Sequence, residues 1–189
     1  MRTAIFALVV AGCSFTPRGD GDGDATAIDA AVDAPVDAPR CGPAYDLGYR
    51  LHVEQSTWLD AERGCEADGG YLAVLDTPTT RAAAIAAAQR LGGDGELWVG
   101  LVRDPLGEGQ NDVEANWRWR WVNGAEVHPG LPWNPGQPDN GGDGTQYVVR
   151  MNRDTGALYD RDTIDSGLTG LCQCDGRAPV NADYDPLTP

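Results

Sequence analysis

Cysteine is the residue type whose spacing constrains this sequence most. The chain of 189 residues has five cysteines, which are Cys13, Cys41, Cys65, Cys172 and Cys174. In an exported chain, which the N-terminus indicates below, the even set of four after Cys13 predicts two disulfides with three possible connectivities. Cys172 and Cys174 are too close to pair readily within a strand, so we expect each to reach a distant partner.

A metal site is the alternative use of Cys172 and Cys174. A structural zinc site needs a second pair of ligands at a matching spacing, and the sequence has none. His52 and His128 are isolated from the cysteines and from each other. We therefore favour disulfides.

Catalytic residue types are not grouped in this sequence. A nucleophile needs a neighbouring base, and neither His52 nor His128 lies in a serine or cysteine motif. Ser166 and Gly167 form no nucleophile elbow. Aspartates at this density form pairs by chance, which gives no support to a glycosidase pair. We predict that the chain is not an enzyme.

The charge balance argues against a nucleic-acid partner. The chain has 29 acidic residues and 14 basic residues, all of them arginine, with a formal net charge of −15 at pH 7. Binding to nucleic acid requires clustered basic residues that neutralise phosphates, and no such cluster occurs.

Residues 1–12 have the layout of an export signal. Arg2 precedes an apolar stretch, Ala4–Val10, that is too short to span a bilayer. Val10-Ala11-Gly12-Cys13 resembles the bacterial lipobox, in which the signal is cut before a cysteine that then receives lipid chains. The resemblance implies lipidation of Cys13, which would hold the protein, extracytoplasmic, on the bacterial outer membrane or cell surface.

Two segments are predicted to be disordered. Residues 13–40 form a linker rich in Asp, Ala and Pro, and residues 178–189 form a tail rich in Pro and Asp. Such segments cannot bury enough apolar area to offset the entropy lost on ordering. The folded domain is therefore expected at residues 41–177.

Capping signals predict two helices early in this domain. Thr57 can cap a first helix, with Asp60 at the third helical position. A second helix is expected to begin at Thr77 or Thr79 and to end at Gly92.

The rest of the domain predicts strands and long loops rich in Gly and Pro. Expected strands are Leu97–Leu101, Trp117–Trp121, Tyr147–Met151 and Ala157–Tyr159. Asn123-Gly124 predicts a hairpin turn after the second of these strands. The alternating tryptophans at 117, 119 and 121 favour core packing over a carbohydrate-stacking platform, and Trp58 and Trp98 are also predicted core. Helices followed by antiparallel strands indicate an α+β fold.

Five motifs, taken in order, resemble the C-type lectin-like domain family. They are Trp58-x-x-Ala61-x-x-x-Cys65 with Gly69-Gly70-Tyr71-Leu72-Ala73; Trp98-Val99-Gly100-Leu101; Trp119-Arg120-Trp121; Trp133 followed by Gly136-Gln137-Pro138-Asp139; and Leu171-Cys172-Gln173-Cys174. The resemblance implies a C-type lectin-like fold, with two helices, antiparallel sheets and a long loop region. It also implies that Cys65 pairs with Cys172, which leaves Cys41 to pair with Cys174.

The resemblance further implies a calcium-dependent carbohydrate site at Gln137-Pro138-Asp139. Galactose-type members of the family carry Gln-Pro-Asp here, with the proline cis. Calcium takes about six to eight oxygen ligands, and the side chains of Gln137 and Asp139 can both supply them. The implied metal ligands are Gln137, Asp139, Asp143, Asp160 and Asp162, of which Gln137, Asp139 and Asp160 also contact the sugar.

Three departures from the family's pattern leave two hypotheses open. Thr145 aligns with an acidic ligand, and the family's Trp-Asn-Asp aligns with Tyr159-Asp160-Arg161, in which Arg161 cannot bind a cation. No aromatic residue follows the Gln-Pro-Asp motif within Asn140–Gly144. The chain is thus expected to bind a glycan or glycoprotein through Ca²⁺, or to bind a protein ligand without metal at a degenerate calcium site.

Overall fold

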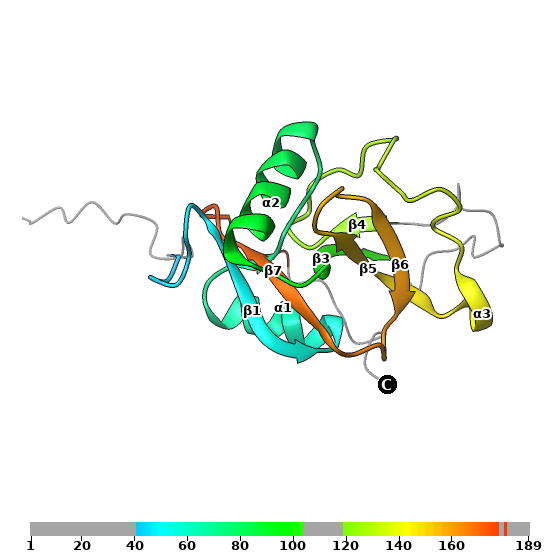
Figure 1. The fold of residues 1–189 in the computed structure, drawn as a ribbon, viewed down its shortest axis with the longest axis horizontal. Coiled ribbons are helices and arrows are strands. Elements are labelled where there is room, and N and C mark those ends of the chain that lie inside the picture. Colours follow the sequence, from blue (N-terminus) through cyan, green and yellow to red (C-terminus); the bar gives the residue numbers. More distant parts are fainter. Residues whose placement is uncertain (1–40, 104–118, 178–179, 181–189) are drawn as a thin grey trace, which may run out of the picture. The chain divides into compact units, whose positions relative to one another are not determined.

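The computed structural model describes residues 41–103, 119–177 and 180 (Figure 1). The predicted signal peptide, Cys13 and the linker 13–40 lie outside these residues, as does the predicted tail except for Val180. The N–H of Val180 donates to the carbonyl of Val122 at 3.0 Å. None of the helices in the described part is long and apolar enough to cross a bilayer.

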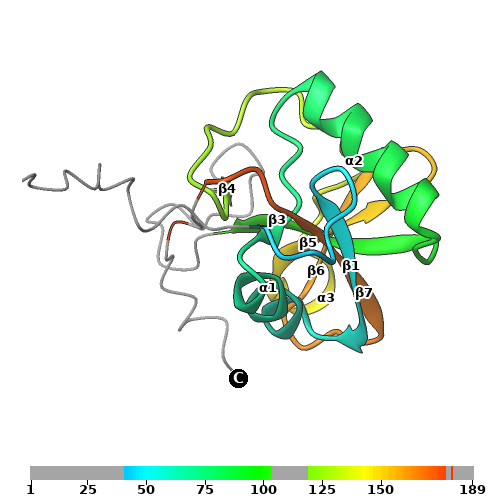
Figure 2. The ribbon, with the colours of Figure 1, turned by 90° about the vertical axis from the view of Figure 1, so that its left-hand side faces the viewer.

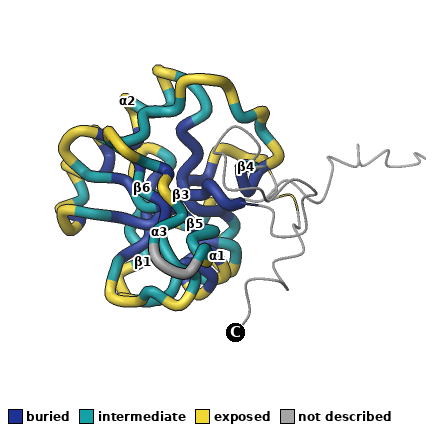
Figure 3. Tube along the Cα trace, turned by 90° about the vertical axis from the view of Figure 1, so that its right-hand side faces the viewer, coloured by how far each residue is buried: buried dark blue, intermediate teal, exposed yellow. Residues whose placement is uncertain are grey.

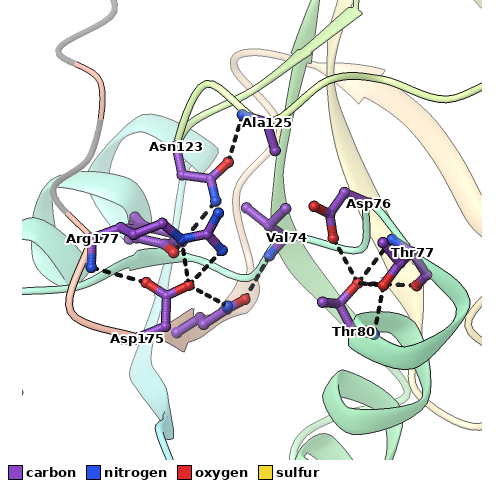
Figure 4. Close-up of polar contacts among 10 residues, drawn as sticks. Val74, Asp76, Thr77, Thr80, Asn123, Ala125, Asp175 and Arg177 are labelled. Carbon is purple, nitrogen blue, oxygen red and sulfur yellow. Dashed lines mark hydrogen bonds and ion pairs between the residues drawn. The ribbon is translucent and has the colours of Figure 1, made fainter.

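The two predicted helices form and are capped as expected. Thr57 caps α1 (Trp58–Ala67) by accepting the N–H of Asp60. Thr77 caps α2 (Pro78–Leu91) through reciprocal hydrogen bonds with Thr80, which Figure 4 shows. Gly92 ends α2 in the left-handed conformation, with φ +74°. A third helix, α3 (Gly141–Gly144), is a single short turn that the sequence did not predict.

The described strands form one sheet, which is mixed rather than purely antiparallel. The strands are β1 (Tyr49–Ser56), β2 (Tyr71–Leu72), β3 (Glu96–Arg103), β4 (Trp119–Trp121), β5 (Gln146–Asn152), β6 (Leu158–Asp162) and β7 (Leu168–Gln173). The main order is β1-β7-β3-β5-β6, with β2 beside β7 and β4 beside β3. The prediction of antiparallel strands is wrong for one pair, because β3 and β7 run parallel. The α+β class and the expected β5–β6 hairpin are confirmed.

Helices α1 and α2 lie on opposite sides of strands β1, β7 and β3 (Figures 1 and 2). The predicted core residues Trp58 and Trp98 are fully buried. The Trp58 indole N–H donates to the carbonyl of Val99 at 2.8 Å, and that of Trp98 donates to the carbonyl of Ser56 at 2.9 Å. Burial is concentrated in the strands, while the connecting loops are largely exposed (Figure 3).

The alternating tryptophans at 117, 119 and 121 do not all lie in the core. Trp121 is buried, which confirms the core prediction, Trp119 is half-buried, and Trp117 lies outside the described residues. The expected turn forms, since the N–H of Gly124 donates to the carbonyl of Trp121 at 2.9 Å. The hairpin prediction is wrong, however, because in the described structure β4 pairs with β3 and with no strand after the turn.

Both disulfides implied by the resemblance are present. Cys65 pairs with Cys172 and Cys41 pairs with Cys174, with Cα atoms 5.4 and 5.6 Å apart. Each bridge therefore joins the start of the domain to its last strand region. The two bonds constrain the unfolded chain across more than 100 residues each, since the paired cysteines are 107 and 133 residues apart.

A polar network attaches the C-terminal end of the domain to β2 and to the turn after β4. The Arg177 guanidinium donates to the carboxylate of Asp175, which Tyr71 also contacts, and Asn123 donates to the Tyr71 hydroxyl (Figure 4). Burial acts to raise the pKa of Asp175, but hydrogen bonds from Arg177 and Tyr71 outweigh it and hold this pKa below its ordinary value. The charged form of Asp175 is therefore favoured in the folded state.

Close packing at Gly100 yields a first prediction. A methyl group there would clash with the carbonyl of Leu72 and the side chain of Val122, so Gly100→Ala should lower the free energy of unfolding by about 1 to 3 kcal/mol. Gly95→Ala is the matched control, because a methyl group at Gly95 meets no atom within 4 Å. Chemical denaturation measures both, and equal stability of the two variants would contradict the packing.

The Asp175 network yields a second prediction, on pH. Because the pKa of Asp175 is lower in the folded than in the unfolded chain, its stabilisation is present above the unfolded pKa and is lost as pH falls through the folded pKa. Between about pH 5 and pH 3, Asp175→Asn should therefore lose less unfolding free energy than the wild type. Asp94→Asn, at an exposed site away from the network, should follow the wild type. Equal acid sensitivity of wild type and Asp175→Asn would count against the network.

Candidate functional site

The loop between β4 and α3 is held against strand β6. Trp133 forms a bridge with Leu158, and the N–H of Asn134 donates to the carbonyl of Leu158 at 3.0 Å. The N–H of Leu158 in turn donates to the carbonyl of Pro132 at 2.9 Å. Further along the loop, the peptide bond between Gln137 and Pro138 is cis, as the resemblance implied.

Asp160 attaches the next part of this loop to β6. Its carboxylate accepts the backbone N–H of Asp139 at 3.2 Å and that of Asn140 at 2.8 Å, one on each oxygen. The residue is only 2% exposed. Burial raises the pKa of Asp160 above its ordinary value, and the two hydrogen bonds offset part of that rise. Asp160 is therefore a buried acceptor for the loop backbone.

The segment after the loop is folded back by its own polar side chains. The N–H of Gly141 donates to Asp139 Oδ1 at 3.0 Å and to Gln146 Oε1 at 2.9 Å. Asn140 Oδ1 accepts the N–H of Gln146 at 3.2 Å, and the Thr145 hydroxyl donates to Asp162. The side chain of Asp143, the remaining predicted ligand, lies outside the described part.

These residues enclose a pocket of about 400 Å³, called here the polar pocket. Four of the five predicted ligands line it, namely Gln137, Asp139, Asp160 and Asp162. The other lining residues are Gly141, Gln146, Arg150, Tyr159 and Arg161. The structure thus brings together most of the residues that the sequence selected.

Two guanidiniums share the polar pocket with its carboxylates. Arg150 stacks over the Tyr159 ring at 4.9 Å and forms an ion pair with Glu96. Arg161 forms an ion pair with Asp165, with Nε and Oδ2 3.6 Å apart. Burial, followed by the nearby charge of Arg161, lowers the pKa of Arg150. The pocket therefore offers both hydrogen-bond donors and acceptors that carry charge.

Strands β5 and β6 pair with a bulge beside the polar pocket. Leu158 is fully buried, whereas Tyr159, aligned with the family's tryptophan, is half-buried. Val148 pairs with Arg161 and Gln146 pairs with Asp162, so β5 has one extra residue, Tyr147, at this point. Asp162, which lies opposite this bulge, lines the polar pocket.

A second pocket, called here the aromatic pocket, has a volume of about 510 Å³. It is lined by Trp119, Val127, His128, Pro129, Gly130, Leu131, Trp133, Gln137 and Pro138. The rings of Trp119 and Trp133 have centroids 5.1 Å apart and are inclined at 51°. Gln137 lines both pockets, so the two adjoin at this residue.

Comparison with known proteins decides the family. No protein-family model matches the sequence. The chain is 31% identical over 136 residues to the C-type lectin BML-2 of Bungarus multicinctus, an alignment that covers 70% of this chain and 79% of BML-2. The chain belongs to the C-type lectin family. Lectins are not enzymes, which agrees with the prediction from the sequence.

Solved C-type lectin structures confirm the fold. The C-type carbohydrate-recognition domain of cow CD23 aligns with a TM-score of 0.55 at 22% identity, covering 71% of this chain and 95% of that one. Human lithostathine aligns with a TM-score of 0.56 at 21% identity, covering 76% and 96%.

Two features of the described residues act against the calcium site that the C-type lectin resemblance implied. Among the side chains that the structure describes, which do not include that of Asp143, no three of His, Cys, Asp or Glu are grouped to hold a metal ion. The carboxylates of Asp139, Asp160 and Asp162 each already accept a hydrogen bond from the protein, which uses part of their capacity as ligands. Arg150 and Arg161 add positive charge to the same pocket, which opposes a cation.

Sequence reasoning missed the donors on β5 and the loop-holding role of Asp160. Arg150 lies opposite Tyr159 across the β5–β6 hairpin, and Gln146 lies opposite Asp162. The hairpin itself was expected. Pairing its two strands residue by residue from the turn would have placed Arg150 opposite Tyr159, so this was the signal that could have found Arg150. No local signal identifies Asp160 as the acceptor for a loop 20 residues earlier in the chain.

The Asp160 contact yields a third prediction. Asp160→Ala removes the acceptor of two loop N–H groups, so it should lower the free energy of unfolding by about 1 to 3 kcal/mol. The matched control is Asp139→Ala, which should change stability much less, because its exposed carboxylate accepts only the N–H of Gly141, and Gln146 also accepts that N–H. Thermal or chemical unfolding compares them, and an Asp160→Ala variant as stable as Asp139→Ala would show that the loop is held by other contacts.

Proposed function

We propose that this chain binds a carbohydrate in the polar pocket by direct hydrogen bonds, without a calcium ion. Membership of the C-type lectin family supports carbohydrate binding. Recognition without calcium is supported by one observation above all: the two oxygens of the Asp160 carboxylate accept the N–H groups of Asp139 and Asn140.

The lining of the polar pocket suits sugar hydroxyls, which both donate and accept hydrogen bonds. The carboxylates of Asp139 and Asp162 accept from a hydroxyl, and the guanidinium of Arg161 donates to one. The amide of Gln137 does both. Hydrogen bonds to charged groups contribute about 1.5 to 3 kcal/mol each, so two or three of them can bind a small ligand.

The sugar class follows from charge rather than from the Gln-Pro-Asp motif. In the family, that motif selects a hydroxyl pair at calcium, so it does not select galactose where the ion plays no part. The pocket holds three carboxylates and two guanidiniums, and the chain has a net charge of −15. Both features disfavour anionic ligands and favour a neutral sugar.

The proposed setting is the outer surface of a bacterial cell. The lipobox-like segment Val10–Cys13 supports attachment by lipid chains on Cys13, and the Asp-rich linker 13–40 would carry the domain away from the membrane. A domain held in this way meets glycans or glycoproteins outside the cell.

Sugar binding with and without metal provides the fourth prediction. The protein should bind a subset of a panel of galactose, mannose and N-acetylglucosamine glycosides equally well in millimolar calcium and in chelator. Calcium alone should leave the melting temperature unchanged. Binding that requires calcium would overturn the calcium-free mechanism, and no binding to any glycoside would overturn carbohydrate recognition.

Arg161→Ala separates the two mechanisms further. Direct recognition predicts a loss of about tenfold or more in sugar affinity, because a charged donor is removed. A calcium cage predicts the opposite, since removing an opposing cation would strengthen metal binding and, through it, sugar binding. Arg63→Ala, at an exposed position on α1 outside the pocket, is the matched control and should bind as the wild type does.

A further inference from the structure

The aromatic pocket adjoins the polar pocket but differs from it in chemistry. Its lining is mostly apolar, with the two indoles of Trp119 and Trp133, and its polar side chains are Gln137 and the exposed His128. None of the described residues that line it is acidic or an arginine. It therefore suits a neutral ligand with one apolar surface and a polar edge.

The two indoles provide a stacking surface. Trp119 and Trp133 are half-buried, and their rings are inclined at 51°, so both present ring surface to the same pocket. Trp133 is fixed by its bridge to Leu158, and Trp119 by the pairing of β4 with β3. A ligand that stacks there meets a preformed surface and loses little free energy to ordering of the protein.

A pyranose ring has the matching chemistry. One of its faces carries mainly C–H groups, which pack against an indole, while its hydroxyls lie around the edge. His128 and Gln137 are placed to hydrogen-bond such an edge. The volume of about 510 Å³ lies within the range of pockets that bind small molecules.

We propose that the aromatic pocket is a second sugar subsite, so that the domain prefers a neutral glycan of at least two units. One unit binds in the polar pocket and the next stacks against Trp119 and Trp133, with Gln137 contacting both. This inference rests on the proposed function, because it extends the ligand from the first pocket into the second.

Calorimetric titration with sugars of increasing length tests the second subsite, using the protein in chelator. The probes are galactose, mannose and N-acetylglucosamine, each beside a disaccharide that contains it: lactose, mannobiose and chitobiose. For the sugar that binds, the disaccharide should bind about tenfold more tightly than the monosaccharide. Trp119→Ala should remove that gain and leave the affinity for the monosaccharide unchanged. Trp119→Tyr, which keeps an aromatic ring, should retain most of the gain.

The outcomes separate this inference from the proposed function. If the monosaccharide binds but chain length and Trp119→Ala have no effect, the second subsite is overturned and sugar binding in the polar pocket stands. If no sugar binds, both are overturned. Should Trp119→Ala not fold, His128→Ala replaces it, because its side chain is exposed; that variant should lose about threefold in disaccharide affinity alone. An unchanged disaccharide affinity in His128→Ala would then overturn the subsite.

Discussion

The loop from Gln137 to Asn140 is placed by the buried carboxylate of Asp160, and both pockets depend on that placement. Two consecutive backbone N–H groups, those of Asp139 and Asn140, donate to its two oxygens. A buried N–H without an acceptor costs about 1 to 3 kcal/mol, so the loop is held to β6 at this point. Gln137 then reaches the polar pocket on one side and the aromatic pocket on the other.

The same contact gives Asp160 a role in this chain that the C-type lectin resemblance did not imply. The resemblance implied that oxygens at positions 137, 139 and 160 would surround a calcium ion and bind sugar through it. Here Asp160 binds backbone, and positive charge in the pocket comes from Arg150 and Arg161, which are covalently part of the protein. In the proposed calcium-free recognition, these guanidiniums donate hydrogen bonds directly to sugar oxygens and take the place of the cation's attraction for hydroxyls.

Features that depend on local sequence were predictable, and those that depend on distant strands were not. Threonine caps, the left-handed Gly92 and the buried Trp58 and Trp98 follow from residue type and spacing, and the disulfide pairing followed from family resemblance. The parallel pairing of β3 with β7 joins segments about 70 residues apart, which no local signal specifies. The extra residue at Tyr147 places Gln146, and not Tyr147, opposite Asp162, and only the paired strands reveal it.

The most direct measurement follows the amide resonances of Asp139 and Asn140 by ¹⁵N NMR while calcium and then a chelator are added. If Asp160 holds these N–H groups, both amides exchange slowly with solvent and their resonances do not move with calcium. Large shifts of both resonances that saturate with calcium and reverse with chelator would show that Asp160 coordinates the ion, and would contradict calcium-free recognition.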